Sequence, residues 1–195
     1  MDQIKDRRSI RKYSSRPVDK KLTDEILSAA ILAPSAKNRQ PWKFIVYSGS
    51  SKNELLTAME KGLTKTKEEL AHMPNSEYML SDAFNTLKIM KEAPTVIIVL
   101  NTNGSSPFTD IDHFARITEI CDSLSIGAAI ENMLLKATEL GLGTLWIANT
   151  SFAYNELVSY IGTTAQLIGA VALGYADEAP YPRPRKSFDE VVEYR

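Results

Sequence analysis

The sequence contains a single cysteine, Cys121, and only two histidines, His72 and His113, among its 195 residues. A lone thiol can form no disulfide within the chain, so nothing indicates an oxidising compartment. Neither histidine has Cys, His or paired carboxylates at the spacing of metal ligands, so we expect both at the surface and no metal site. Cys121 lies within a predicted helix, where we interpret it as a packed thiol. Because a G-x-S-x-G motif is also missing, we do not expect nucleophilic hydrolysis.

Long apolar runs are also lacking. The longest runs, such as residues 96–100, are much shorter than the roughly 18 residues that span a bilayer. The first twelve residues are charged and do not contain the apolar core of a signal peptide. We therefore expect a soluble, cytoplasmic protein with no membrane partner. The dinucleotide fingerprint is missing as well, because the G-x-G at 141–143 follows a helix and has no third glycine at the required spacing.

Net charge is nearly absent, since 23 Lys and Arg face 24 Asp and Glu, which leaves −1. The balance is uneven along the chain: residues 1–43 hold eleven basic and five acidic side chains, and residues 44–182 hold eight and sixteen. A cationic N-terminus on an acidic body indicates that an anion binds locally. A non-enzymatic nucleic-acid clamp is one alternative. The acidic central region and the lack of a helix-turn-helix signature argue against it, so we expect no nucleic-acid partner.

Hydrophobic spacing predicts an uneven alternation of helices and strands. Helices are expected over residues 19–33, 51–72, 76–91, 110–140 and 152–161, and strands over residues 42–47, 93–100, 144–147, 167–175 and, in the tail, 187–195. We expect Asp19 to cap the first helix, Pro74-Asn75 to separate the next two, and Gly141 to end the long one. This pattern predicts one domain over residues 1–195 in which helices cover a sheet.

Two cationic clusters stand near opposite ends of the chain. In an extended backbone, Arg7, Ser9 and Arg11 project to the same side, and together they form a donor cluster for phosphate or carboxylate oxygens. A solvated basic arm is the alternative interpretation. The second cluster, Arg183 and Arg185, lies in a proline-stiffened segment.

Two further segments could face a planar ligand. In the loop at residues 34–41, Asn38 and Gln40 can each donate and accept hydrogen bonds, as the edge of a heteroaromatic ring requires. The glycines at 141 and 143 permit close approach of a flat ring to the backbone. An ordinary polar loop and a helix C-cap followed by a strand are the respective alternatives.

The order and spacing of these motifs resemble the FMN-dependent nitroreductase family. RRSIRK is followed about 25 residues later by PSAKNRQPW, then by ELGLGTLW at the end of the long helix and by PRPRKSFDEVV near the C-terminus. The resemblance extends from Arg7 to Val192. It implies an α+β, three-layer α/β/α fold with a mixed, mostly antiparallel sheet. It further implies an obligate homodimer with a swapped C-terminal tail, which the small-residue patch at 127–129 suits.

The same resemblance implies that bound FMN carries the chemistry and that the chain supplies no catalytic residue. NADH or NADPH would be the reductant, and a nitroaromatic, a quinone or a similar small molecule would be the acceptor. The residues implied to contact the FMN phosphate and ribityl chain are Arg7, Arg8, Ser9, Arg11, Arg183 and Arg185. Those implied to lie beside the flavin ring from the partner subunit are Pro34, Ser35, Ala36, Lys37, Asn38 and Gln40. Those implied to lie against the isoalloxazine are Leu142, Gly143 and Thr144.

The resemblance leaves the substrate open. Flavin reduction, enone reduction and reductive dehalogenation are alternative activities of the same fold. Asn85 and Lys88 lie in the region from which some members contact the pyrimidine edge of the flavin. Residues 60–78 fall where the family varies most and where it covers the substrate, so the acceptor is the least transferable property.

Overall fold

A four-stranded antiparallel sheet forms the centre of the computed structural model, which describes residues 2–73 and 75–195. The strands are Trp42–Ser48 (β1), Thr95–Asn101 (β2), Gly143–Ile147 (β3) and Gln166–Gly174 (β4), in the spatial order β1-β2-β4-β3. All three strand pairings are antiparallel, so the expectation of a mixed sheet was wrong. Parallel pairing is limited to one isolated bridge between Ser9 and Thr144, because the N-terminal segment runs alongside β3 over too few residues to form a strand.

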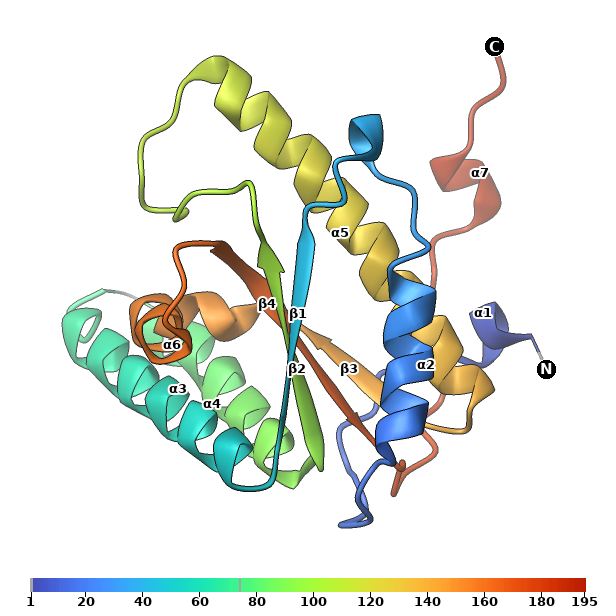
Figure 1. Cartoon of the computed structure of the whole chain (residues 1–195), viewed down its shortest axis with the longest axis horizontal. Coiled ribbons are helices and arrows are strands. Elements are labelled where there is room, and N and C mark those ends of the chain that lie inside the picture. Colours follow the sequence, from blue (N-terminus) through green and yellow to red (C-terminus); the bar gives the residue numbers. More distant parts are fainter. Residues whose placement is uncertain (1, 74) are drawn as a thin grey trace.

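Helices cover both faces of this sheet (Figure 1). The long helix α5 (His113–Glu139) and α2 (Lys20–Ala30) pack on one face. On the other face lie α3 (Gly49–Glu69), α4 (Ser76–Glu92) and α6 (Tyr154–Ile161). The three-layer arrangement expected from the sequence is therefore confirmed.

The central strand β2 explains why two cores form. All seven of its residues are buried, as its continuous apolar run predicts. Because successive side chains point to opposite faces, Ile97 and Val99 pack with α2 and α5, whereas Val96 and Ile98 pack with α3 and α4.

Several predicted boundaries are confirmed by their caps. The Asp19 carboxylate accepts a hydrogen bond from the Lys21 N–H at 2.8 Å, and Gly141 has a φ of +74° just beyond α5. Helix α5 begins three residues later than expected, because Asp112 caps it through the N–H groups of Phe114 and Ala115. These two bonds lower the pKa of the Asp112 carboxyl. Pro74, in the predicted helix break, lies outside the described residues.

The predicted strand in the C-terminal tail was wrong, because Phe188–Val191 forms a short helix, α7. Ser187 and Glu190 form a capping box in which the backbone N–H and the hydroxyl of Ser187 donate to the Glu190 carboxylate, each at 2.8 Å. We predicted a strand over residues 187–195, but the Ser-x-x-Glu spacing determines the local structure. A second short helix, α1 (Gln3–Asp6), lies at the other end of the chain.

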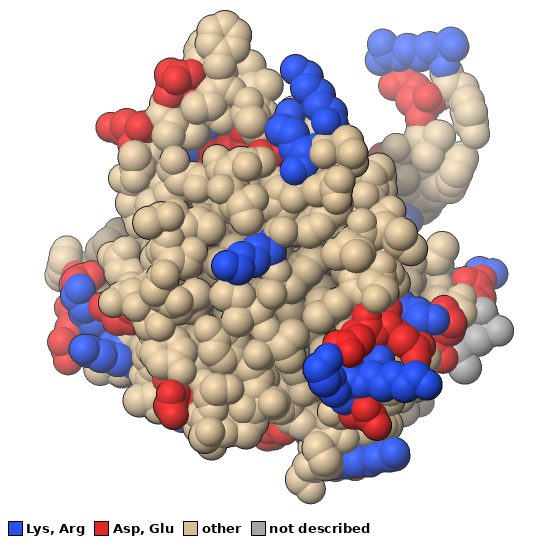
Figure 2. Space-filling view, viewed as in Figure 1, with Lys and Arg blue, Asp and Glu red and all other residues tan. Residues whose placement is uncertain are grey.

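One side of α5 remains uncovered. Ile117, Ile120 and Leu124 are 58%, 52% and 71% exposed, and Cys121, which we expected to be packed, is only partly buried. His72 and His113 are exposed, as expected. The face seen in Figure 2 has its charged side chains mainly at the margins, and its centre over β1 is uncharged except for a cationic side chain.

Two absences concern the described part of the chain. Within residues 2–73 and 75–195, no helix combines the length and the apolar character that crossing a membrane requires. The same residues contain no group of three His, Cys, Asp or Glu side chains that could hold a metal ion.

The pairing of β3 with β4 generates a prediction at Gly169. An added Cβ there would lie 2.3 Å from the carbonyl oxygen of Ile147, a backbone atom that cannot rotate away. We expect Gly169→Ala to reduce the free energy of unfolding by about 1–3 kcal/mol. For a chain of this size, that corresponds to a thermal midpoint about 2–12 °C lower. Calorimetry measures the midpoint, and an unchanged value would show that the strands can separate without cost.

Candidate functional site

The N-terminal segment is held in place by Ile10, an apolar residue that lies between Arg8 and Arg11 in the sequence. Ile10 is buried in the core beside α3 and α4, and its N–H donates to the Thr144 carbonyl of β3 at 2.9 Å. The Tyr13 hydroxyl donates to the Ile10 carbonyl at 2.9 Å, and burial raises the pKa of Tyr13, which keeps this hydroxyl protonated. With Ile10 directed inward, Ser9 and Arg11 on either side of it are directed toward a cavity.

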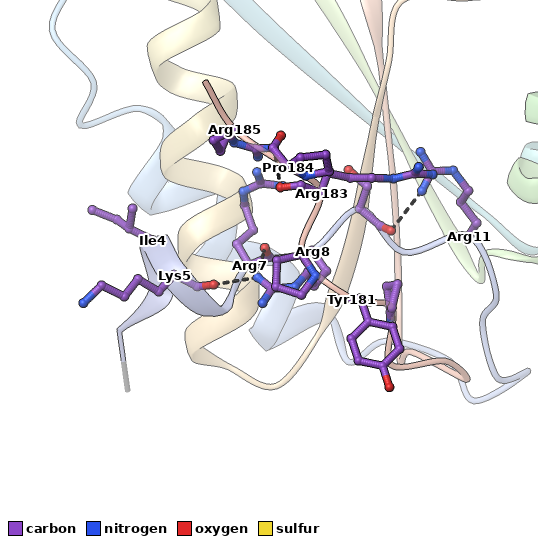
Figure 3. Close-up of a pocket in the computed structure, with 12 residues that line it drawn as sticks. Ile4, Lys5, Arg7, Arg8, Arg11, Tyr181, Arg183, Pro184 and Arg185 are labelled. Carbon is purple, nitrogen blue, oxygen red and sulfur yellow. Dashed lines mark hydrogen bonds between the residues drawn. The ribbon is translucent and has the colours of Figure 1, made fainter. Parts of the chain in front are cut away.

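That cavity has a volume of about 600 Å³ and is formed by the two ends of the chain (Figure 3). Its floor comes from residues 4–11 and its other wall from residues 180–185. The cationic side chains that line it are Lys5, Arg7, Arg8, Arg11, Arg183 and Arg185. The lining described by the structure includes no Asp or Glu. The structure thus brings together all six residues that we predicted for an anion site from the two cationic motifs, Ser9 included.

The guanidinium groups in this cavity bond to backbone carbonyls. Arg8 Nη1 donates to the carbonyls of Lys5 (2.5 Å) and Arg7 (2.8 Å), and Arg11 Nη1 donates to that of Ser9 (3.3 Å). Arg185 Nη1 likewise donates to the backbone carbonyl of Arg183 at 3.2 Å. A carbonyl is a neutral acceptor, so these bonds orient the guanidinium groups without cancelling their charge. The cavity therefore presents a positive potential suited to an anion.

Arg7 is oriented differently, since its Nε lies 3.5 Å from the Glu131 carboxylate of α5. This half-exposed carboxylate links the cavity to the long helix. The pair holds one arginine at the back of the site and leaves the other guanidinium groups directed toward the cavity.

A carboxylate that sequence reasoning missed joins the two walls. Glu178 accepts hydrogen bonds from the backbone N–H groups of Arg11 and Lys12, and the Asp177 N–H donates to the Lys12 carbonyl at 2.9 Å. These bonds fix the start of the tail against the N-terminal segment, so that residues 180–185 follow on the open side of the cavity. No local pattern marks Glu178, because its partners lie more than 160 residues away in the sequence.

The loop at residues 34–40 does not line this cavity. It contains a 3-10 turn, η1 (Ala36–Asn38). The loop lies beside one part of α5, whereas α1 lies beside another part (Figure 1). Its exposed residues Lys37, Asn38 and Gln40 have φ values of +54°, +53° and +47°, and the Gln40 amide donates to Asn38 Oδ1 at 3.1 Å. Within one chain, therefore, the predicted ring-binding loop and the predicted phosphate site are separate.

Leu142, Gly143 and Thr144 lie directly behind the N-terminal segment. Leu142 and Thr144 are 4% and 2% exposed, so their side chains face the interior. A Cβ added to Gly143 would come within 2.8 to 3.0 Å of three atoms of Ile10, which explains why only glycine allows this approach. A contact between this segment and a flat ring stays a prediction. The contact that the structure does show is with Ile10.

Asn85 and Lys88 lie on the exposed side of α4. Asn85 lines a separate cavity of about 600 Å³ together with Tyr78, Asp82 and Phe152. Within residues 60–78, the described residues include the end of α3 and the first residues of α4. The predicted roles of these residues toward a flavin and an acceptor remain predictions.

Gly143→Ala tests whether Ile10 positions the arginines. The added methyl should displace Ile10 and lower the free energy of unfolding by about 1–3 kcal/mol. Combining it with Ile10→Ala, which removes two of the three atoms in conflict, should cost less than the sum of the single changes. Urea denaturation of the four proteins measures this coupling. Strictly additive costs would mean that the two residues do not interact.

Comparison with known proteins agrees with this geometry. Residues 4–175 match the model of the nitroreductase family. A protein of Archaeoglobus fulgidus, provisionally named NADH dehydrogenase/NAD(P)H nitroreductase, is 31% identical over 189 residues, which cover 94% of this chain and 86% of the relative.

Solved structures agree as well. A nitroreductase-like family protein from Bacillus cereus superposes with a TM-score of 0.73 at 28% identity, covering 99% of this chain and 94% of the other. A provisionally named nitroreductase from Desulfovibrio desulfuricans, solved in complex with FMN, has a TM-score of 0.72 at 25% identity, covering 99% and 95%. On the family match and the shared fold together, the chain belongs to the nitroreductase family.

Proposed function

We propose that this protein is an FMN-dependent NAD(P)H oxidoreductase in which the arginine-lined cavity holds the FMN phosphate. The observation that carries the proposal is the cavity of about 600 Å³ with six cationic side chains and no carboxylate in its described lining. A phosphate monoester carries nearly two negative charges at pH 7, and guanidinium groups are well suited to bind its oxygens in pairs. The FMN complex of the Desulfovibrio desulfuricans relative supports the choice of anion.

The residues present fit this group by their chemistry. Arg11 and Arg185 would hold the phosphate from the two walls, and the Ser9 hydroxyl can donate to the phosphate or to the ribityl chain. When bound, FMN supplies the redox chemistry, since it takes up two electrons from NADH or NADPH and passes them to an electron-poor acceptor such as a nitroaromatic or a quinone. The chain itself binds and orients the cofactor. Arg8 and Lys37 are the cations that we propose for stabilising its reduced, anionic form.

We also propose that the functional unit is a homodimer with exchanged C-terminal tails. On α5, Ile117, Ile120 and Leu124 follow at helical spacing and form an apolar stripe, each more than half exposed. The tail carries Phe188, with 61% of its surface exposed, and extends away from the body of the chain (Figure 1). Exposed apolar surface on this scale is typical of a subunit interface. A second copy would cover it and bring its own loop 34–40 to the cavity.

Anaerobic reduction tests the proposed function. Protein loaded with FMN should lose its absorbance near 450 nm on addition of NADH or NADPH, and a panel of nitroaromatics, quinones, enones and free flavins should restore it at different rates. That panel separates the general reductase from its specialised alternatives. A protein that binds no FMN and oxidises neither nucleotide would refute the proposal.

Two arginine variants test the phosphate assignment. Arg11→Ala and Arg185→Ala should each weaken FMN binding by about 1.5–3 kcal/mol, the range for charge-assisted hydrogen bonds, or about 10- to 150-fold. Riboflavin, which lacks the phosphate, should bind equally to wild type and variants. Lys20→Ala removes an exposed cation of α2 and serves as the matched control. Quenching of flavin fluorescence gives the dissociation constants, and equal FMN affinity in all four proteins would contradict the assignment.

Leu124→Glu tests the proposed dimer. A charge at this most exposed position of the apolar stripe should convert a dimer into monomers, because burying an unpaired carboxylate costs several kcal/mol. Thr57→Glu adds the same side chain at an exposed position of α3 and should leave assembly unchanged. Light scattering coupled to size exclusion measures the mass. A Leu124→Glu protein that stays dimeric would place the interface elsewhere.

A further inference from the structure

A buried carboxylate on α5 lies beneath the loop of residues 34–40. The side chain of Asp122 is only 1% exposed, although the helix around it is mostly apolar. An ionised carboxylate in such a position requires partners, because its desolvation costs several kcal/mol. None of the proposed cofactor contacts involves Asp122, so its burial needs another explanation.

The principal partner of Asp122 is Arg39 from this loop. Arg39 Nε donates a hydrogen bond to Asp122 Oδ1 at 2.8 Å, and Arg39 Nη2 lies 2.7 Å from the same oxygen as an ion-pair contact that lacks hydrogen-bond geometry. The other carboxylate oxygen, Oδ2, accepts from the Asn103 side-chain amide at 3.3 Å. The Nε hydrogen bond on one oxygen and the amide on the other fix the orientation of the carboxylate, and the guanidinium charge compensates its negative charge. Three-quarters of the Arg39 side chain is withdrawn from solvent, which strengthens the pair relative to a surface one.

The loop needs such an anchor because its backbone is strained. Lys37, Asn38 and Gln40 all have φ near +50°, a conformation that costs residues with a Cβ roughly 1 kcal/mol or more each. Three such residues within four positions would relax to ordinary conformations in a free loop. Arg39, the one residue between them with a negative φ, is the residue that pairs with Asp122.

Contacts on either side of Arg39 complete the anchoring. The Ala36 N–H donates to the Ser125 hydroxyl of α5 at 3.2 Å, and the Pro41 carbonyl accepts from Thr102 N–H at 2.7 Å. Asn103 in turn donates its backbone N–H to Asn101, the last residue of β2. The loop is therefore tied to α5 and to the end of the sheet, with Asp122 at the centre of these contacts.

From this arrangement we infer that Asp122 is a positioning residue for the flavin-facing loop. Acting through Arg39, it holds the strained backbone that presents Asn38 and Gln40 outward, where their amides can donate to and accept from the flavin ring. Asp122 touches no cofactor itself. The inference rests on the proposed function for the role of the loop, but the anchoring of the loop can be tested without flavin.

The first experiment uses the protein without flavin. Trypsin cleaves after Lys37 and Arg39 only when the loop leaves its anchored conformation, so the cleavage rate at these bonds reports the anchoring. In Asp122→Asn, which keeps the shape of the side chain and removes its charge, we expect cleavage about tenfold faster than in wild type. Glu139→Gln neutralises an exposed carboxylate on the same helix and is the matched control. Equal rates in all three proteins would overturn the inference.

The second experiment measures flavin affinity at 25 °C. Asp122→Asn should weaken binding of FMN and of riboflavin by the same factor, about tenfold, because the loop is proposed to contact the ring that both share. Asn38→Ala should weaken flavin binding too. The double variant Asp122→Asn/Asn38→Ala should bind flavin no worse than the single variant with the lower affinity, since both changes act through one loop. Additive losses would assign Asp122 a general structural role and overturn the inference.

Arg39→Lys provides a second route if Asp122→Asn does not fold. A lysine keeps the charge but loses the directed Nε hydrogen bond, and we expect an intermediate effect on both measurements. The two proposals fail in different ways. Wild type that binds no flavin would refute the proposed function, whereas wild-type binding with unchanged variants would refute only the role of Asp122.

Discussion

The whole cationic site depends on how Ile10 packs beside Gly143. Several like charges gathered around one cavity repel each other, so an attachment that does not involve those charges must hold them together. Burying a side chain of this size contributes about 1.5–3 kcal/mol, and the Thr144 and Tyr13 hydrogen bonds fix its direction. Apart from Arg7, which lies against Glu131, the arginines that line the cavity have no carboxylate partner among the described residues. Their charge therefore remains available for a ligand, which is the opposite of the usual surface ion pair.

The contact that attaches the tail to the N-terminal segment does not engage the arginine side chains. Glu178 is a carboxylate near the arginines, yet it binds the backbone N–H groups of Arg11 and Lys12 and does not line the cavity. The tail is thereby attached to the N-terminal segment while the guanidinium groups stay oriented by carbonyls. Elsewhere on α5, the Asp122–Arg39 pair offsets the backbone strain of the loop that carries the exposed amides of Asn38 and Gln40.

Local patterns in the sequence predicted the elements but not their long-range contacts. The apolar run at 96–100, the Asp19 cap and the glycine after α5 were sufficient to place β2, α2 and the end of the long helix. The Ser187 capping box was equally visible, and neglecting it led to the wrong strand in the tail. The arginine motifs predicted the cationic cavity because an arginine keeps its positive charge wherever the fold places it. By contrast, Glu178, Asp122 and Arg39 are typical surface residues by composition, and only the tertiary structure shows that they hold segments far apart in sequence.

The apolar stripe on α5 shows the remaining limit of sequence reasoning. Ile117, Ile120 and Leu124 have the periodicity of a packed face, and the same periodicity serves a core or an interface between subunits.

The most direct test of the proposed phosphate site is the ³¹P resonance of bound FMN between pH 8 and pH 5. A phosphate monoester has a second pKa near 6, and surrounding guanidinium groups lower it. In the arginine-lined cavity, the bound phosphate should show the chemical shift of the dianion throughout this range. A bound phosphate that titrates near pH 6, as in free FMN, would contradict the proposed site.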